Sequence, residues 1–67
     1  MSVYRVIDVI GTSPTSWEEA AKAAITTAGG SVRDLRIAQV TSQDVAIGEG
    51  GDLVFRTKVQ LSFKYES

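Results

Sequence analysis

Carboxylates are the side chains in this sequence whose type and surroundings best suit a bound metal ion. The candidates are Asp8, Asp44, Glu49 and Asp52. Asp44 follows the oxygen-rich run Thr41-Ser42-Gln43, and the last two acids flank Gly50-Gly51, whose carbonyls can turn toward an ion. Hard divalent cations take oxygen ligands and accept carbonyls beside carboxylates. We therefore predict these four acids as metal ligands. No EF-hand loop is present, so a site must be assembled in space or between subunits.

Each of these acids also has a purely structural interpretation. Asp8 lies among β-branched residues and can belong to a solvent-facing strand, with Arg5 or Arg36 as an ion-pair partner. Asp44 can lie on an ordinary exposed strand face, and the two acids beside the glycines can form a solvated hairpin tip. Both interpretations stay open at the level of sequence.

The composition excludes most catalytic chemistry. The chain has neither histidine nor cysteine, which rules out imidazole ligands, thiolate metal sites, disulfides and histidine-based acid–base catalysis. No carboxylate pair has a spacing that fixes general acid and general base roles. We therefore expect no catalytic residue and a protein that is not an enzyme.

Charge and hydropathy argue against two classes of partner. Eight acidic and seven basic residues give a net charge of −1, so the electrostatic footprint of a protein that binds nucleic acid or an anionic membrane is missing. No apolar run reaches the roughly 18 residues of a transmembrane helix, and no signal peptide is recognisable. The expectation is a soluble cytoplasmic protein that binds neither nucleic acid nor membrane.

Four elements must position these side chains, in the order β-α-β-β within a single domain of residues 1–67. The odd-numbered residues of 53–65 are apolar, broken only by Thr57, and the even-numbered ones from Arg56 to Lys64 are polar, which predicts a long half-buried strand. A helix is predicted from Ser16, with Glu19 at the capping-box spacing, to Gly29-Gly30.

Two further strands are predicted, over residues 2–10 and about 35–47. Gly11 closes the first of them, and residues 12–15 have turn chemistry. The strand over about 35–47 is expected to place four apolar residues on one face, because all four have odd numbers: Leu35, Ile37, Val45 and Ile47. A hairpin loop is predicted over residues 48–52.

The predicted sheet has more apolar surface than its helix can cover. The apolar face of the helix consists of alanines with Trp17 and Ile25, so it brings little area. Chains of about 60 residues bury only ~60% of their unfolded surface and lie near the limit of stability. We therefore expect the chain to complete its core against copies of itself.

The chain resembles the dodecin family over residues 3–65. The resemblance lies in Gly11-Thr12-Ser13-x-x-Ser16-Trp17-Glu18-Glu19-Ala20-Ala21, in Val32-x-x-Leu35, and in a long hairpin that closes with Val59-x-Leu61-x-Phe63. It implies an α+β fold in which a three-stranded antiparallel sheet is partly wrapped around one helix. It also implies that twelve copies assemble into a hollow shell with tetrahedral symmetry.

Typical dodecins stack two flavin rings between Trp side chains of the second strand, and a Gln of the third strand bonds the ring edge. The resemblance puts Ile37 at that Trp, Gln39 at a usual Glu and Arg56 at the Gln. Ile37 has no π-face, and aromatic stacking is worth roughly 0.5–1.5 kcal/mol per pair beyond buried area. We therefore expect tight flavin binding to be lost or much weakened.

Trp17 is on the helix, outside that slot, and either lines a ligand cleft or belongs to a core or interface.

A smaller dodecin subgroup lacks the stacking Trp and is described as calcium-binding, and this chain resembles it over residues 1–8 and 13–18. The resemblance implies a non-enzymatic homododecameric shell that binds calcium or a similar hard cation. Two alternatives stay open. One is a shell that sequesters a flavin (riboflavin or FMN) or another phosphate-bearing cofactor such as coenzyme A, with Arg56, Lys58 and Lys64 on one strand face for the phosphate. The other is a small oligomeric interaction module.

Overall fold

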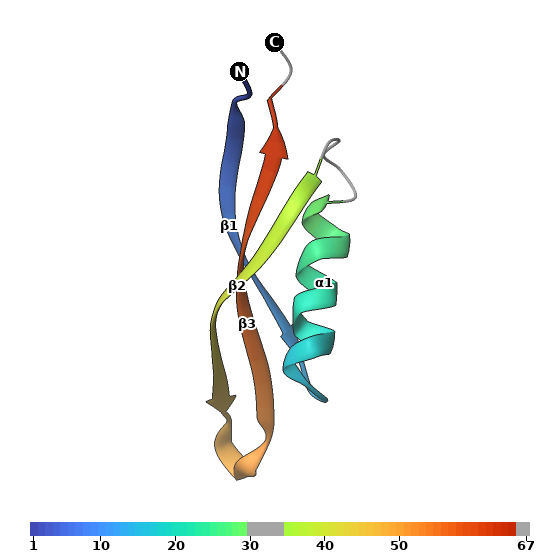
Figure 1. Cartoon of the computed structure of the whole chain (residues 1–67). Helices are drawn as coiled ribbons and strands as arrows, with labels where there is room; N and C mark the ends of the chain where they lie inside the picture. The colour runs from blue at the N-terminus through green and yellow to red at the C-terminus, as the bar shows by residue number, and fades with distance from the viewer. Residues whose placement is uncertain (30–34, 66–67) are drawn as a thin grey trace.

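A computed structural model of the chain describes residues 1–29 and 35–65. The elements follow in the order β1 (Tyr4–Ser13), α1 (Trp17–Gly29), β2 (Leu35–Ile47) and β3 (Leu53–Lys64), with a short 3₁₀ turn, Glu49–Gly51, between the last two. The molecule is elongated, with extents of 51 × 19 × 15 Å. Figure 1 shows β1 beginning and β3 ending at the same end of the molecule, while the β2–β3 hairpin forms the other end.

The sheet has β3 at its centre and is antiparallel throughout, with the order β1-β3-β2. The predicted α+β fold with three antiparallel strands and one helix is therefore confirmed. The alternation of β3 is also confirmed, because its odd-numbered residues from Thr57 to Phe63 are buried beneath the helix. Its even-numbered residues lie on the other side of the sheet, as the period of two requires.

The helix begins where the sequence predicts. The Ser16 hydroxyl oxygen accepts a hydrogen bond from the Glu19 backbone N–H at 3.0 Å, which satisfies a donor that has no partner inside the helix. Ser13 holds the preceding turn, because its side-chain oxygen accepts from the Thr15 N–H at 3.0 Å. The helix runs to Gly29. The second glycine of the predicted stop, Gly30, lies outside the described residues.

Helix and sheet approach each other closely at Gly11. A Cβ atom at this position would lie 1.9 Å from the carbonyl oxygen of Ala20 and 2.9 Å from the Cβ of Ala24. Thr57 is fully buried at this level, and its hydroxyl donates to the Trp17 carbonyl at 2.9 Å. The prediction that Gly11 closes the first strand is wrong. The strand continues through Ser13, because Gly11 pairs with Thr57 and serves as the contact point for the helix.

The bounds of β2 are confirmed, but its predicted side-chain parity is wrong. The register shifts between Leu35 and Ile37 and again between Val40 and Ser42. Each shift inserts one extra residue and exchanges the two faces of the strand. Leu35 and Val45 consequently lie on the helix side, whereas Ile37 pairs with Ser62 and lies on the other side.

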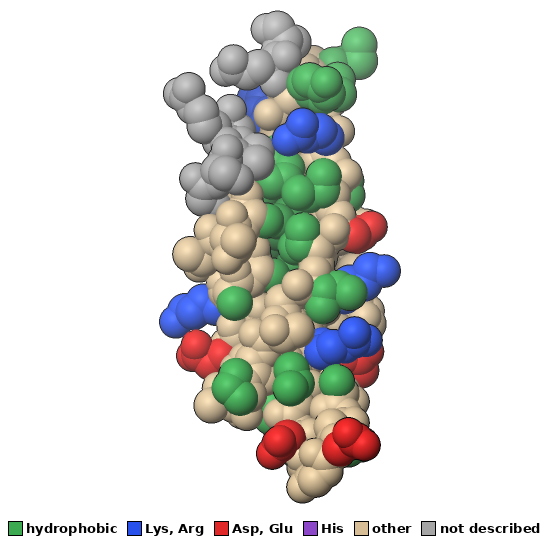
Figure 2. Space-filling view, turned by 180° about the vertical axis from the view of Figure 1, so that it is seen from behind, with side chains coloured by type: hydrophobic (Ala, Val, Ile, Leu, Met, Phe, Trp, Pro, Cys, Tyr) green, Lys and Arg blue, Asp and Glu red, His purple; other side chains and the backbone are tan. Residues whose placement is uncertain are grey.

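The core is small and much apolar surface remains open. Ala24, Val59, Leu61 and Phe63 form its buried centre. The helix packs on β1 and β3 and hardly touches β2, so Val40 and Ile47 on the helix side of β2 stay exposed. Figure 2 shows apolar side chains along most of the length of the face in view. No helix of the described residues has the length and hydropathy to cross a membrane.

Candidate functional site

The side of the sheet turned away from the helix, here called the open face, carries most of the predicted site residues. The strand register places alternate residues of all three strands on it. β1 contributes Tyr4, Val6, Asp8, Ile10 and Thr12. The other two strands contribute Ile37, Gln39, Ser42, Asp44, Ala46, Val54, Arg56, Lys58, Gln60, Ser62 and Lys64.

Asp44 and Arg56 form a bidentate ion pair on the open face. They are cross-strand partners of β2 and β3, and the Arg56 Nε and Nη2 atoms donate to the two carboxylate oxygens of Asp44 at 2.7 Å each. The hydrogen bonds from Arg56 lower the pKa of the Asp44 carboxyl below its ordinary value, and the same bonds raise the pKa of Arg56. Since each carboxylate oxygen accepts a short hydrogen bond from Arg56, the guanidinium neutralises the charge that would attract a cation to Asp44.

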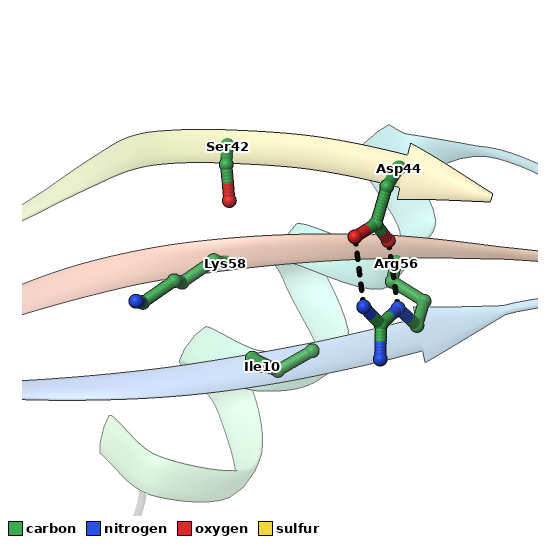
Figure 3. A pocket seen from close by; sticks show the side chains of 5 residues that line it. All are labelled: Ile10, Ser42, Asp44, Arg56 and Lys58. Atoms are coloured by element: carbon green, nitrogen blue, oxygen red, sulfur yellow. Dashed lines mark hydrogen bonds and ion pairs between the residues drawn. The ribbon is translucent and has the colours of Figure 1, made fainter. Parts of the chain in front are cut away.

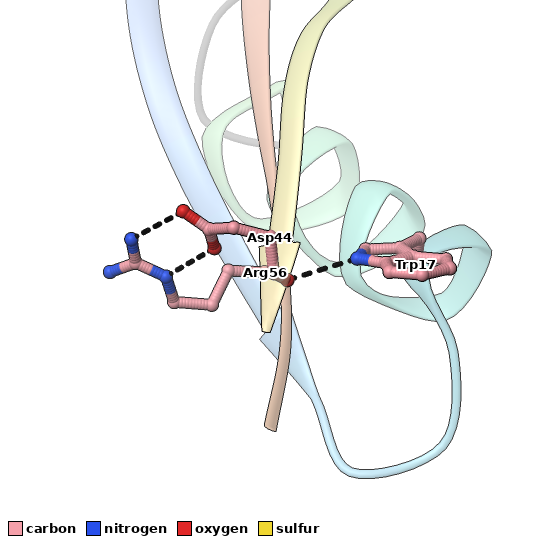
Figure 4. Close-up of polar contacts among 3 residues, drawn as sticks. All are labelled: Trp17, Asp44 and Arg56. Carbon is pink, nitrogen blue, oxygen red and sulfur yellow. Dashed lines mark hydrogen bonds and ion pairs between the residues drawn. The ribbon is translucent and has the colours of Figure 1, made fainter. Parts of the chain in front are cut away.

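Trp17 contacts the same β2 residue from the opposite side of the sheet. Its indole N–H donates to the Asp44 backbone carbonyl at 2.9 Å, as Figure 4 shows. Its ring also meets Phe55 edge-on, with the centroids 5.1 Å apart and an interplanar angle of 78°. Trp17 therefore secures the start of the helix to the end of the sheet, and it is not on the open face with the other predicted ligand-binding residues.

A shallow depression of about 230 Å³ opens beside the ion pair. Ile10, Ser42, Asp44, Arg56 and Lys58 line it, and Figure 3 shows their side chains together on the side away from the helix. Among the described residues Lys58 has no side-chain partner, so the depression carries one uncompensated positive charge beside an apolar wall from Ile10. This combination suits a small anion or a phosphate group.

Asp8 lies in a row of oxygen-bearing side chains across the middle of the open face. The register makes Gln60 of β3 the partner of both Asp8 of β1 and Gln39 of β2. In the part of the chain that the structure describes, the Asp8 carboxylate has no ion-pair or hydrogen-bond partner, and Arg5 lies on the other side of the sheet, over the ring of Phe63 at 5.5 Å. The row joins one carboxylate to two amides, which are oxygen ligands that calcium accepts.

Gln60 is a site residue that sequence reasoning missed. Gln60 is one of the polar residues in the alternating pattern of residues 53–65. Its place between Asp8 and Gln39 depends on the pairing of all three strands, including the bulge that puts Gln39 on the open face. Ile37 and Arg56 are on this face as well. The structure thus brings three of the four predicted ligand-binding residues to one surface.

Glu49 and Asp52 are exposed at the tip of the hairpin. Gly50 and Gly51 turn the chain with φ values of 86° and 91°, which favour glycine. Two of the local carbonyls are already used, because Gly48 O accepts from the Gly51 N–H and Asp52 O accepts from the Gly48 N–H. Within residues 1–29 and 35–65 of one chain, no three carboxylates gather in a way that could hold a metal ion. A site with several carboxylates would need more than one copy.

Comparison with known proteins identifies the same fold and sequence pattern elsewhere. The family model described as Dodecin matches residues 3–66. The calcium dodecin of Mycobacterium tuberculosis is 55% identical over 64 residues, which are 96% of this chain and 90% of that protein. A crystal structure of that calcium dodecin, described as calcium chelating with a novel calcium-binding site, superposes with a TM-score of 0.89 at 52% identity and covers 97% of this chain and 93% of its own.

Two other solved structures have lower identity and the same fold. The dodecin of Streptomyces coelicolor superposes with a TM-score of 0.88 at 32% identity, covering 98% of this chain and 94% of its own. A variant of the Thermus thermophilus dodecin gives 0.88 at 28% identity, with both chains fully covered. The likeness therefore extends over the whole protomer and is not confined to one motif.

Proposed function

The chain belongs to the dodecin family, and from this premise we propose that it forms a hollow homododecameric shell that binds calcium or a similar hard cation. The observation that carries the proposal is the 55% identity to a calcium dodecin over nearly the full length of both chains. The proposed role is binding without catalysis, in a cytoplasmic store or buffer whose main partner is the chain itself.

The exposed apolar surface of the protomer supports self-assembly. Apolar side chains of β2 lie exposed on both faces of the sheet, with Val40 and Ile47 on the helix side and Ile37 on the open face. Exposed apolar surface on both faces of one strand suits contacts with further copies. Association with further copies would bury it and enlarge a core that is small for a stable domain.

Asp8 is the strongest of the four proposed cation ligands. Its carboxylate has no partner among the described residues, and the amide oxygens of Gln60 and Gln39 share its row. Asp44 is the weakest because Arg56 holds both of its oxygens. Glu49 and Asp52 would serve only where a neighbouring copy supplies further oxygens to the hairpin tip.

Calorimetric titration of chelator-treated protein with calcium chloride tests the proposal. The wild type should bind calcium, and Asp8→Asn should weaken binding by about tenfold or more, because calcium affinity depends on the number of charged ligands. Glu18→Gln is the matched control, since it removes one exposed carboxylate from the helix and should leave binding unchanged. Absence of calcium binding by the wild type, in calorimetry and in equilibrium dialysis, would refute the cation-binding function. Equal binding by both variants would show that Asp8 is not a ligand.

The depression next to Arg56 and Lys58 favours a second candidate function. A shell that sequesters a flavin or another phosphate-bearing cofactor would use these cations for the phosphate and Ile10 for an apolar contact. The colour of the purified protein distinguishes the two candidates, because bound flavin is yellow and a shell that holds only metal is colourless. Denaturing a yellow sample and recording the fluorescence of the released compound would identify the flavin.

A further inference from the structure

The hairpin extends beyond the rest of the sheet as a two-stranded arm. The last residue of β1, Ser13, pairs with Phe55, so residues 46–54, here called the hairpin arm, have no β1 neighbour. The arm is nevertheless apolar: Ile47 is 75% exposed, and Leu53 and Val54 are exposed as well. A two-stranded hairpin is marginally stable in water by itself. An arm with this composition therefore needs an apolar surface to cover it.

The opposite end of the molecule offers such a surface. β1 begins and β3 ends there (Figure 1), and residues 3–6 and 63–65 are here called the strand-terminal end. Its exposed apolar side chains are Val3, Tyr4, Val6 and Tyr65. The Tyr65 N–H donates to the Val3 carbonyl at 2.7 Å, so the first and last strands are still paired at this end.

The two ends carry opposite charges. The hairpin arm contains Glu49 and Asp52 and no basic residue, whereas the strand-terminal end contains Arg5 and Lys64 and no acidic residue. Figure 2 shows acidic side chains at the hairpin end of the view, in addition to others nearer the middle of the molecule. The ends lie at the two extremes of a molecule 51 Å long, so a protomer cannot pair its own ends. Only another molecule can bring them together.

We propose that the hairpin arm of one copy docks on the strand-terminal end of the next copy. The contact buries the apolar residues of both ends and brings Glu49 and Asp52 close to the partner's Arg5 and Lys64. In this contact the two acids pair with cationic side chains and do not bind a metal ion. The proposal rests on the homododecameric shell and assigns one of its interfaces. It is a head-to-tail contact between two different surfaces, and contacts of this type close into rings when the rotation between copies permits.

Charge exchange tests the contact. The variant Glu49→Lys/Asp52→Lys reverses the hairpin arm, and Arg5→Glu/Lys64→Glu reverses the strand-terminal end. Each should place like charges in contact, so the concentration at which the assembly dissociates should rise by about tenfold or more, measured by light scattering during size-exclusion chromatography. Lys22→Glu, on the exposed middle of the helix, is the control and should leave dissociation unchanged.

The chain with all four substitutions provides the decisive measurement. It should assemble close to wild-type concentration, because opposite charges meet again with their positions exchanged. Restoration also demonstrates that none of the four substitutions prevents folding. It further separates the contact from cation binding at the tip, since the exchanged tip has no carboxylate to hold an ion.

The outcomes distinguish this contact from the shell on which it rests. A wild type that stays monomeric would refute the shell itself. A wild-type assembly that both single-end variants leave intact would overturn the contact alone. Failure of the fourfold variant to recover would also overturn the charge pairing between the two ends.

Discussion

Arg56 decides what Asp44 can do. A carboxylate with a bidentate guanidinium partner is already neutralised, and both of its oxygens accept short hydrogen bonds. The Trp17 N–H holds the backbone of the same residue from the other side of the sheet. Asp44 therefore joins the helix, β2 and β3, and its most direct contribution is to the position of these elements.

The ion pair predicts a loss of stability in acid. The folded protein lowers the pKa of Asp44 through its hydrogen bonds with Arg56, from an ordinary value of 3.8. The stabilisation is therefore complete well above that value and is lost as the pH falls through it toward the lowered pKa. Unfolding temperatures recorded from about pH 6 down to about pH 2 should fall more steeply for the wild type than for Asp44→Asn. Arg56→Gln should flatten the profile equally, and a profile that Arg56→Gln leaves unchanged would assign the acid sensitivity to other carboxylates.

Ile37 predicts a gain of flavin binding on substitution. The side chain is 60% exposed on the open face, so Ile37→Trp can present an indole ring there without disturbing the core. An aromatic ring at this position should strengthen riboflavin binding by about threefold to tenfold per stacked pair, from the typical energy of aromatic contacts. Quenching of riboflavin fluorescence measures it, with Val40→Trp on the helix side of β2 as the control. Equal quenching by wild type and both variants would show that Ile37 is outside any flavin slot.

Site residues were easier to nominate than to group. The sequence identified Asp8 and Asp44 by type and local context, and Arg56 by the family resemblance and its basic strand face. The sequence did not reveal that Arg56 forms an ion pair with Asp44, because this contact depends on the pairing of the two residues across β2 and β3. Gln60 was missed for the same reason. Local chemistry is enough to propose a residue as a candidate. To predict which candidates lie together, the register of all three strands is needed.

At the scale of elements, the packing of the helix on the sheet depends on a single glycine. Gly11 is buried directly against Ala20 and Ala24 of the helix. The alanine-rich face of the helix is effective only because β1 presents no side chain at this point. The buried hydroxyl of Thr57 then reaches the Trp17 carbonyl, which explains the one polar residue in the apolar parity of β3.

Gly11→Ala should therefore destabilise the protein strongly. The added methyl group would lie 1.9 Å from a backbone oxygen of the helix, and the helix would have to move. Overpacking of this kind costs about 1–3 kcal/mol and occasionally more. Urea unfolding should show a lower midpoint with an unchanged slope. Gly48→Ala is the control, since its φ is −86° and its nearest neighbour would be 3.7 Å away. Similar losses in both variants would show that the close approach is not the cause.

Regular elements were predictable, and their irregularities were not. The alternation of β3, the capped start of the helix and the bounds of β2 follow from periodicity and capping chemistry. The two bulges of β2 leave no clear mark in composition, yet they exchange its faces and decide that Ile37 is on the open face. The sequence predicts a strand end at Gly11, whereas the strand continues and this glycine permits close packing of the helix.

At the scale of the whole molecule, the protomer has apolar surface on both faces of its sheet and at both ends. The helix packs mainly on β1 and β3, and few side chains of the described residues are fully buried. Apolar burial contributes about 25 cal/mol per Å², so the area that one protomer buries by itself gives little stability in excess of the entropy cost of folding. Folding and assembly should therefore be linked in this protein.

This linkage predicts a stability that depends on protein concentration. Anything that binds the folded state stabilises it by mass action, and in an oligomer the ligand is the protein itself. The unfolding temperature should rise steadily from low micromolar to high micromolar concentration, while a monomeric domain would show one constant value. Light scattering over the same range should find a particle of twelve 7.2 kDa chains that dissociates only as the chains unfold. A well-folded 7.2 kDa monomer at low micromolar concentration would contradict the linkage, because it would demonstrate that one helix is a sufficient cover for the sheet.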